Sequence, residues 1–174
     1  MNKPEEMIVV LDFGGQYNQL IARRIRDLGV YSELLPYQTS AAKIAELKPK
    51  GIVFSGGPAS VYGENAPLVD PGVYELGIPI LGICYGMQMM SHQLNGRVER
   101  AGKREYGKAI VEFAPHCQLV QGMELKQQVW MSHSDRVAEP PTGFVVDAST
   151  EHAPIAAMSH PERRFYAVQF HPEV

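Results

Sequence analysis

An apolar segment that runs directly into a cysteine flanked by glycines is the feature that most constrains this chain. The pattern predicts a strand over residues 78–83, the sharp turn Gly82-Ile83-Cys84-Tyr85-Gly86, and a helix over residues 87–94. Such a turn is strained and packs closely against neighbouring backbone, which explains a glycine on each side of the cysteine. The positive end of the following helix stabilises a thiolate at its start. Cys84 is therefore predicted to be a nucleophile rather than a buried, inert thiol.

The length and composition indicate one globular domain, and the net charge argues against a strongly charged binding partner. A chain of 174 residues can bury a sizeable core, and 45% hydrophobic with 20% charged residues is ordinary for a globular protein. We therefore expect a single domain over residues 1–174. The net charge of −3 and the lack of a basic stripe argue against a nucleic-acid partner.

The cysteine spacing and the N-terminal residues indicate whether a metal site is expected and in which compartment the protein lies. The two cysteines, Cys84 and Cys117, belong to no Cys-x-x-Cys pair, and no His-Glu-x-x-His pattern occurs, so no metal site is expected. The first residues carry acids and no apolar core, unlike a secretory signal, and no run of about 18 apolar residues could span a membrane. We expect a cytoplasmic protein without a membrane partner, in which a catalytic thiol stays reduced.

The first half of the chain alternates short apolar runs with helical periodicity. Strands are expected over residues 7–11, 31–35, 51–55 and 78–83, and helices over residues 16–28, 40–47, 69–76 and 87–94. Ser40 is a suitable N-cap for the second of these helices. Strands that alternate with helices in this way predict a parallel sheet covered by helices on both faces.

The second half of the chain lacks that alternation. From Val98 onward, turn-rich segments separate apolar runs over residues 109–113, 128–131, 144–148, 155–158 and 165–170. These runs predict antiparallel or mixed strands attached to the parallel part. The predicted fold is thus α/β, a flavodoxin-like, open and mostly parallel sheet with an added antiparallel or mixed region.

A cysteine nucleophile needs a base, and the base needs a group that orients it. Two of the six histidines lie in the same tripeptide, His160-Pro161-Glu162 and His171-Pro172-Glu173. The first falls in a turn, whereas the second follows an expected strand and lies roughly 20 Å away along it. If that strand is parallel to the one before Cys84, His171 reaches the carboxyl edge of the sheet, where ligands bind. We therefore expect His171 as the base and Glu173 as its orienting group.

An acyl-transfer site also needs N–H donors for an oxyanion. The backbone N–H of Tyr85, directly after the nucleophile, is one expected donor. The second is expected from Gly56-Gly57, because this loop follows a neighbouring parallel strand; a plain turn is the alternative. Gly14-Gly15 lacks both the Gly-x-Gly-x-x-Gly spacing and a P-loop lysine, so a phosphate site there is not favoured.

Three segments resemble the signatures of class I (triad) glutamine amidotransferases. They are Phe54-Ser55-Gly56-Gly57-Pro58, Gly82-Ile83-Cys84-Tyr85-Gly86-Met87-Gln88 and Gln169-Phe170-His171-Pro172-Glu173. Further segments are similar to the amidotransferase domains of GMP synthases: Leu11-Asp12-Phe13-Gly14-Gly15-Gln16-Tyr17, Leu20-Ile21-Ala22-Arg23-Arg24, Arg104-Glu105-Tyr106-Gly107 and Val129-Trp130-Met131-Ser132-His133-Ser134-Asp135. The resemblance covers nearly the whole chain.

The resemblance implies hydrolysis of the side-chain amide of L-glutamine. It implies Cys84 as the nucleophile, His171 as the acid and base, and Glu173 as the orienting carboxylate, with the N–H groups of Gly57 and Tyr85 as oxyanion donors. It also implies a substrate pocket lined by Gln88, Ser132, His133, Ser134 and Asp135. The family commonly has glycine at the position of Ser134.

The resemblance further implies a partner. No cofactor is expected for glutamine hydrolysis, and the ammonia would pass to an ATP-pyrophosphatase synthetase unit that uses ATP and magnesium to convert xanthosine monophosphate to GMP. The sequence contains no phosphate-binding loop for ATP, so this unit is expected on a separate subunit or on the remainder of a fused chain. Relatives continue past the triad glutamate with a strand and a helix, whereas this sequence ends at Val174. A domain without its last segment is therefore expected.

Three alternatives stay open. The first is an amidotransferase that serves another pathway, such as chorismate amination or carbamoyl phosphate synthesis. The second is a free-standing cysteine hydrolase on a similar sheet, which would act on peptides or γ-glutamyl compounds without a partner. The third is a non-catalytic regulatory or interaction domain that retains the fold.

Overall fold

The computed structural model describes residues 6–174, with only the backbone of residues 101–103. Within this part, the strands form one nine-stranded sheet in the order β2-β1-β3-β4-β9-β8-β7-β5-β6. The elements are β1 (Met7–Asp12), α1 (Asn18–Asp27), β2 (Tyr31–Pro36), α2 (Ala41–Leu47), β3 (Gly51–Phe54), the 3-10 helix η1 (Pro71–Glu75), β4 (Ile80–Ile83), α3 (Tyr85–Gln93), β5 (Arg97–Phe113), the 3-10 helix η2 (Gln118–Val120), β6 (Lys126–Glu139), β7 (Val145–Ser149), β8 (Ala157–His160) and β9 (Phe165–Val168).

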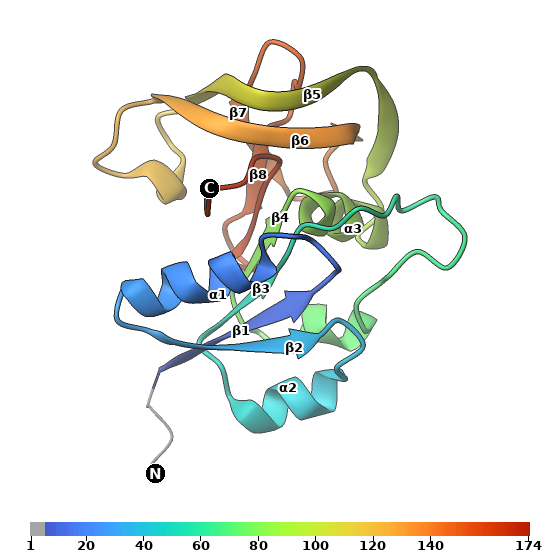
Figure 1. Cartoon of the computed structure of the whole chain (residues 1–174), viewed down its shortest axis with the longest axis vertical. Coiled ribbons are helices and arrows are strands. Elements are labelled where there is room, and N and C mark those ends of the chain that lie inside the picture. Colours follow the sequence, from blue (N-terminus) through green and yellow to red (C-terminus); the bar gives the residue numbers. More distant parts are fainter. Residues whose placement is uncertain (1–5) are drawn as a thin grey trace.

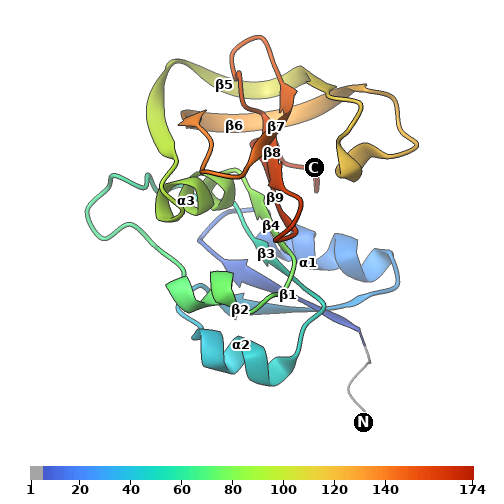
Figure 2. The ribbon, with the colours of Figure 1, turned by 180° about the vertical axis from the view of Figure 1, so that it is seen from behind.

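The five strands β2, β1, β3, β4 and β9 are parallel, which confirms the predicted parallel sheet. β9 pairs with β4 in a register that sets Val168 opposite Ile83. Because parallel strands end at the same edge, the residues that follow β4 and β9 lie side by side. The last strand of the chain thus returns to the centre of the sheet (Figure 2).

Helices cover both faces of the parallel part, as predicted. Side chains alternate along β1, so that Val9 and Leu11 pack on one face and Val10 packs on the other, all fully buried. The first face packs against α2, η1 and α3, and the second face packs against α1. Figure 1 shows α1 and α2 on opposite sides of β1 and β2.

The second half of the sheet is antiparallel, as predicted, but two of its strands are much longer than the apolar runs indicate. β5 and β6 pair from Arg97 opposite Glu139 to Glu112 opposite Lys126, and they lie across the top of the molecule in Figure 1. The predicted strands cover only residues 109–113 and 128–131 of this pair. The remaining residues include many polar side chains, which hide a strand from a search for apolar runs.

The predicted first-half elements agree with the structure within two residues at each end, except for one helix. Residues 69–76 form only the short 3-10 helix η1, where the Asp70 carboxylate accepts from the Gly72 N–H at 3.0 Å. A proline at its start and Gly77 just beyond its end leave room for little more than one turn. Ser40 caps α2 as predicted, because its hydroxyl accepts from the Lys43 N–H at 3.1 Å.

Among the described residues, none of the helices combines the length and the apolar character needed to span a membrane.

Candidate active site

Cys84 lies at the sharp junction of β4 and α3. Its φ of 52° and ψ of −107° are a backbone conformation that residues with a side chain rarely adopt. A Cβ at Gly82 would lie 2.8 Å from the Gly86 carbonyl oxygen, and a Cβ at Gly86 would lie 2.5 Å from the Phe54 carbonyl oxygen. Close backbone approach therefore requires glycine on both sides of the cysteine.

Cys84 is only 5% exposed, and its thiol has two polar neighbours, one on β6 and one just after β9. It donates to the Ser132 carbonyl of β6 at 3.4 Å, and the Gln169 side-chain amide approaches the sulfur at 3.7 Å. The backbone N–H of Cys84 donates to the Val168 carbonyl at 2.9 Å, so β9 also holds the turn. Cys84 is the N-cap of α3, and the positive end of the helix dipole favours negative charge at the sulfur.

His171 and Glu173 form a buried pair immediately after β9. His171 Nδ1 lies 2.7 Å from Glu173 Oε1, and the two residues are 8% and 4% exposed. The His171 N–H donates to the Trp130 carbonyl of β6 at 2.9 Å, and the Arg24 side chain of α1 donates to the Glu173 carbonyl at 3.1 Å. Contacts from two distant elements therefore hold the segment that carries both side chains.

The pKa of His171 is raised from its ordinary value of 6.5 to about 9. Burial by itself lowers this pKa, but the hydrogen bonds and charges of Cys84 and Glu173 outweigh burial. An imidazolium at His171 is therefore favoured at neutral pH. Since Nδ1 faces Glu173, the other ring nitrogen remains for the sulfur or for a substrate.

Cys84 and His171 open onto one cavity of about 300 Å³, called here the first cavity. A Cβ built on Gly56 would lie 3.0 Å from His171 Cε1 and 3.5 Å from Cys84 Cβ, so this glycine sits against both side chains. The remaining lining residues are Gly14, Gly15, Gln16, Tyr17, Asn18, Gly57, Pro58, Ser132 and Glu173. The structure thus brings the thiol and the imidazole together. By contrast, His160 ends β8 and packs on Phe144.

A second cavity of about 650 Å³ also reaches Cys84 and shares part of its lining with the first. It is lined by Gly57, Pro58, Ala59, Ser60, Cys84, Gln88, Arg100, Arg104, Tyr106, Ser132, His133, Ser134 and Asp135. All five residues expected in a substrate pocket are among them. Ser134 lies in the regular strand β6 and is exposed.

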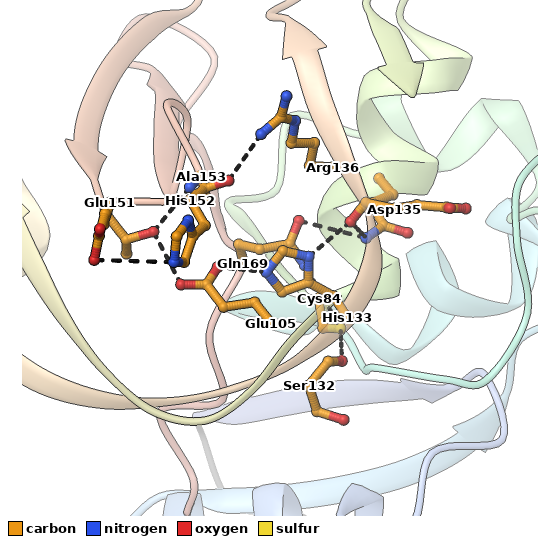
Figure 3. A network of polar contacts seen from close by, with 12 residues as sticks. Cys84, Glu105, Ser132, His133, Asp135, Arg136, Glu151, His152, Ala153 and Gln169 are labelled. Carbon is orange, nitrogen blue, oxygen red and sulfur yellow. Dashed lines mark hydrogen bonds and ion pairs between the residues drawn. The ribbon is translucent and has the colours of Figure 1, made fainter. Parts of the chain in front are cut away.

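A chain of hydrogen bonds runs along the wall of the second cavity (Figure 3). The Gln88 side-chain amide donates to the Asp135 carbonyl at 2.9 Å and lies 3.4 Å from Gln169 Oε1. His133 Nδ1 lies 2.8 Å from the same Asp135 carbonyl, and its Nε2 lies 3.0 Å from Glu105 Oε2. Both ring nitrogens of His133 are therefore engaged within the protein.

Both residues expected as oxyanion donors lie near Cys84, since Tyr85 follows it in the chain and Gly57 lines the two cavities with it. The loop at Gly57 packs against Phe13, the residue that follows β1, because a Cβ on this glycine would lie 2.2 Å from the Phe13 carbonyl oxygen. The loop is braced by Ser55, whose hydroxyl accepts from the Phe13 N–H at 2.9 Å. The Tyr85 side chain is buried and donates to the Pro67 carbonyl, so only the backbone of Tyr85 can serve the site.

Several residues around Cys84 are not among those predicted from the sequence. Gln169 contacts the sulfur, and Tyr17 lies edge-on to His171 with ring centroids 5.7 Å apart. Gln169 is a polar residue within the apolar run 165–170, which is the signal that the sequence offers, and the structure buries it fully. Tyr17, the residue before α1, meets His171, which follows β9, only through the tertiary fold.

Among residues 6–174, leaving aside the side chains of residues 101–103, no group of three or more histidine, cysteine, aspartate or glutamate residues could hold a metal ion.

Comparisons with known proteins agree with this geometry. Residues 9–174 match the family model described as glutamine amidotransferase class-I. The chain is 62% identical over 174 residues to a GMP synthase [glutamine-hydrolyzing] of Heliobacterium modesticaldum, covering 100% of this chain and 34% of that protein. It is 60% identical over 170 residues to the Geobacillus kaustophilus protein of the same name, covering 98% of this chain and 33% of that protein.

A solved structure is also similar. The crystal structure of a putative GMP synthase subunit from Thermoplasma acidophilum superposes with a TM-score of 0.88 at 30% identity, covering 99% of this chain and 87% of that chain. The present chain spans about a third of the length of the curated relatives above. Both the matched family model and this structural similarity lead to one assignment: the chain belongs to the class I glutamine amidotransferase family.

Proposed function

We propose that this chain hydrolyses L-glutamine to glutamate and ammonia through a thioester on Cys84. The observation that carries the proposal is the single cavity onto which Cys84 and the buried His171–Glu173 pair open. A nucleophile, a base and a group that orients the base are the parts that this chemistry requires.

The reaction begins when the Cys84 thiolate attacks the amide carbon of the substrate. The N–H groups of Gly57 and Tyr85 hold the negative charge that develops on the carbonyl oxygen, and losing one such donor typically costs about 3–4 kcal/mol. His171 gives a proton to the departing ammonia, which leaves a γ-glutamyl thioester. His171 then takes a proton from water, the resulting hydroxide attacks the thioester, and glutamate and the thiolate are released. Glu173 keeps the imidazole oriented through Nδ1.

The second cavity is the proposed seat of the substrate glutamine. Its five proposed contacts are Gln88, Ser132, His133, Ser134 and Asp135, which lie on α3 and β6. Arg100 and Arg104 supply positive charge at the same cavity, which suits a free α-carboxylate. A free amino acid therefore fits this cavity better than an apolar substrate does.

We further infer that the ammonia serves GMP formation. The two relatives described above are named GMP synthase [glutamine-hydrolyzing] and are about three times as long as this chain. The proposed partner is an ATP-pyrophosphatase unit that uses ATP and magnesium to convert xanthosine monophosphate to GMP. Glutamine hydrolysis itself uses no cofactor in this proposal. The proposed location is the cytoplasm, where the thiol stays reduced.

The alternatives predict different results. An amidotransferase for chorismate amination or carbamoyl phosphate synthesis would support those products when given the matching synthetase. A free-standing cysteine hydrolase would act on peptides or other γ-glutamyl compounds. A non-catalytic domain would leave glutamine unchanged.

The test measures glutamate release from glutamine by the chain and by its Cys84→Ala variant, followed by glutamine-dependent GMP formation with an added synthetase unit. We expect activity in the unmodified chain and its loss in the variant, because alanine lacks the thiolate that attacks the amide. Glutaminase activity that survives in Cys84→Ala would refute the thioester mechanism. Activity with glutamine but without GMP formation would refute only the partner assignment.

A further inference from the structure

Glu105 of β5 is a buried carboxylate that the reaction proposed above does not use. The residue is 8% exposed, and its Oε2 lies 3.0 Å from His133 Nε2. Its Oε1 accepts from the Thr150 hydroxyl at 3.2 Å, and that hydroxyl in turn accepts from the Ala153 N–H at 2.9 Å. A carboxylate is costly to bury unless it is paired in this way, so these contacts account for its place in the interior.

The two partners of His133 determine that its Nδ1 carries a hydrogen. Its Nδ1 faces the Asp135 carbonyl, which can only accept, so Nδ1 carries a hydrogen. Its Nε2 faces Glu105, so the pair is either an imidazolium with a carboxylate or an imidazole with a carboxylic acid. In both arrangements Glu105 satisfies Nε2 and leaves the hydrogen on Nδ1. Glu105 thereby keeps the ring oriented toward the Asp135 carbonyl.

The Asp135 carbonyl is the point at which this buried pair meets the second cavity. It also accepts from the Gln88 amide at 2.9 Å, and that amide lies 3.4 Å from Gln169 Oε1. The Gln169 amide lies 3.7 Å from the Cys84 sulfur. A continuous set of polar contacts thus joins Glu105 to the nucleophile (Figure 3).

Strand geometry gives Glu105 a second way to act on the same cavity. Its register partner is His133, and the β5–β6 register shifts between Arg100 and Glu105. The neighbouring residues Arg104 and Tyr106 line the second cavity, whereas the Glu105 side chain is buried. The buried pair therefore anchors β5 against β6 where these two strands form the cavity wall.

We propose that Glu105 is a positioning residue for glutamine: through His133 it holds the Asp135 carbonyl and the Gln88 amide at the wall of the second cavity. This inference rests on the glutaminase function proposed above. Because Glu105 touches no reacting atom, its loss weakens substrate binding more than it slows the chemical step.

The experiment compares Glu105→Ala with Glu105→Gln in the 174-residue chain, with Glu112→Ala as the control because Glu112 is an exposed acid on the same strand. We expect Glu105→Ala to raise the KM for glutamine about tenfold, as for the loss of a buried hydrogen-bond partner, with kcat within about twofold. Glu105→Gln should restore the KM, because its amide can donate to His133 Nε2 while its carbonyl accepts from Thr150. Glu112→Ala should match the unmodified chain.

A second measurement keeps the inference testable if Glu105→Ala does not fold. Nitrogen-15 NMR of the unmodified chain should find a hydrogen on Nδ1 of His133, and a bare Nδ1 would overturn the proposal. An unchanged KM in a folded Glu105→Ala, or a Glu105→Gln that fails to restore it, would also overturn it. These results leave glutaminase activity in place, whereas loss of the proposed function would appear as no hydrolysis by the unmodified chain.

Discussion

Gly56 offers a direct test of the catalytic geometry, because it sits against both reacting side chains. In a Gly56→Ala variant the new methyl would lie 3.0 Å from His171 Cε1 and 3.5 Å from Cys84 Cβ. The first contact is too short to persist, so the imidazole must move by a few tenths of an ångström. This movement also changes its 2.7 Å contact with Glu173.

The expected effect is on turnover rather than on folding. Misplacement of a catalytic group on the ångström scale can cost about 100-fold in rate, so a smaller shift should lower kcat by about 10- to 100-fold. The φ of Gly56 lies outside the left-handed region, so its backbone accepts alanine. Replacing glycine by alanine at such a position contributes about 0.4–1 kcal/mol of stability through the unfolded chain, which offsets part of the clash.

The assay is steady-state release of glutamate from glutamine, together with thermal unfolding of each variant. Gly51→Ala is a matched control, since its methyl would lie 2.9 Å from the flexible Ile8 side chain, on β3 and away from Cys84. We expect Gly51→Ala to keep kcat within about twofold of the unmodified chain, since it moves no catalytic group. A folded Gly56→Ala with unchanged kcat would refute the placement of His171 against this glycine, and an equal loss in both variants would show that the effect is not local.

Two further predictions concern the His171–Glu173 segment. Because the pKa of His171 is raised from 6.5 to about 9, its contribution to stability is complete below pH 6.5 and is lost as the pH rises through 9. Urea unfolding at pH 6 and pH 10 should therefore show a loss of about 3 kcal/mol that is absent from His171→Asn, and an equal pH dependence in the variant would contradict this reasoning. Arg24→Met removes the donor to the Glu173 carbonyl and should lower kcat about 3- to 10-fold, whereas Arg23→Met on the same helix should not. Equal kcat in the two variants would show that Arg24 does not hold the segment.

The first half of the fold follows from its sequence because local pattern and tertiary environment agree there. Short apolar runs between helices can be satisfied only by a parallel sheet buried on both faces, and β1 to β4 follow that rule. The long strands β5 and β6 do not, because polar side chains line a cavity and a solvent-exposed face. In this part of the chain, strand pairing rather than apolar periodicity decides where a strand begins and ends.

Some residues of the candidate site can likewise be predicted from the sequence, whereas others are recognised only in the structure. Gly82 and Gly86 predict the turn at Cys84 from the sequence. Both are needed because neighbouring backbone, within a few residues or on the next strand, lies too close for a Cβ. Glu105 carries no comparable local signal. Glu105 becomes meaningful only when β6 brings His133 opposite it.

The sequence by itself determined a strained turn that presents a cysteine at the end of a strand, because steric limits on backbone act over a few neighbouring residues. It also offered two identical His-Pro-Glu tripeptides, and their positions relative to the expected strands favoured the second. Only the tertiary structure decided that the tripeptide at His171 meets the cysteine, because β9 runs parallel to β4 and ends at the same edge of the sheet. The physical reason is that strand direction and register depend on contacts between residues far apart in the chain.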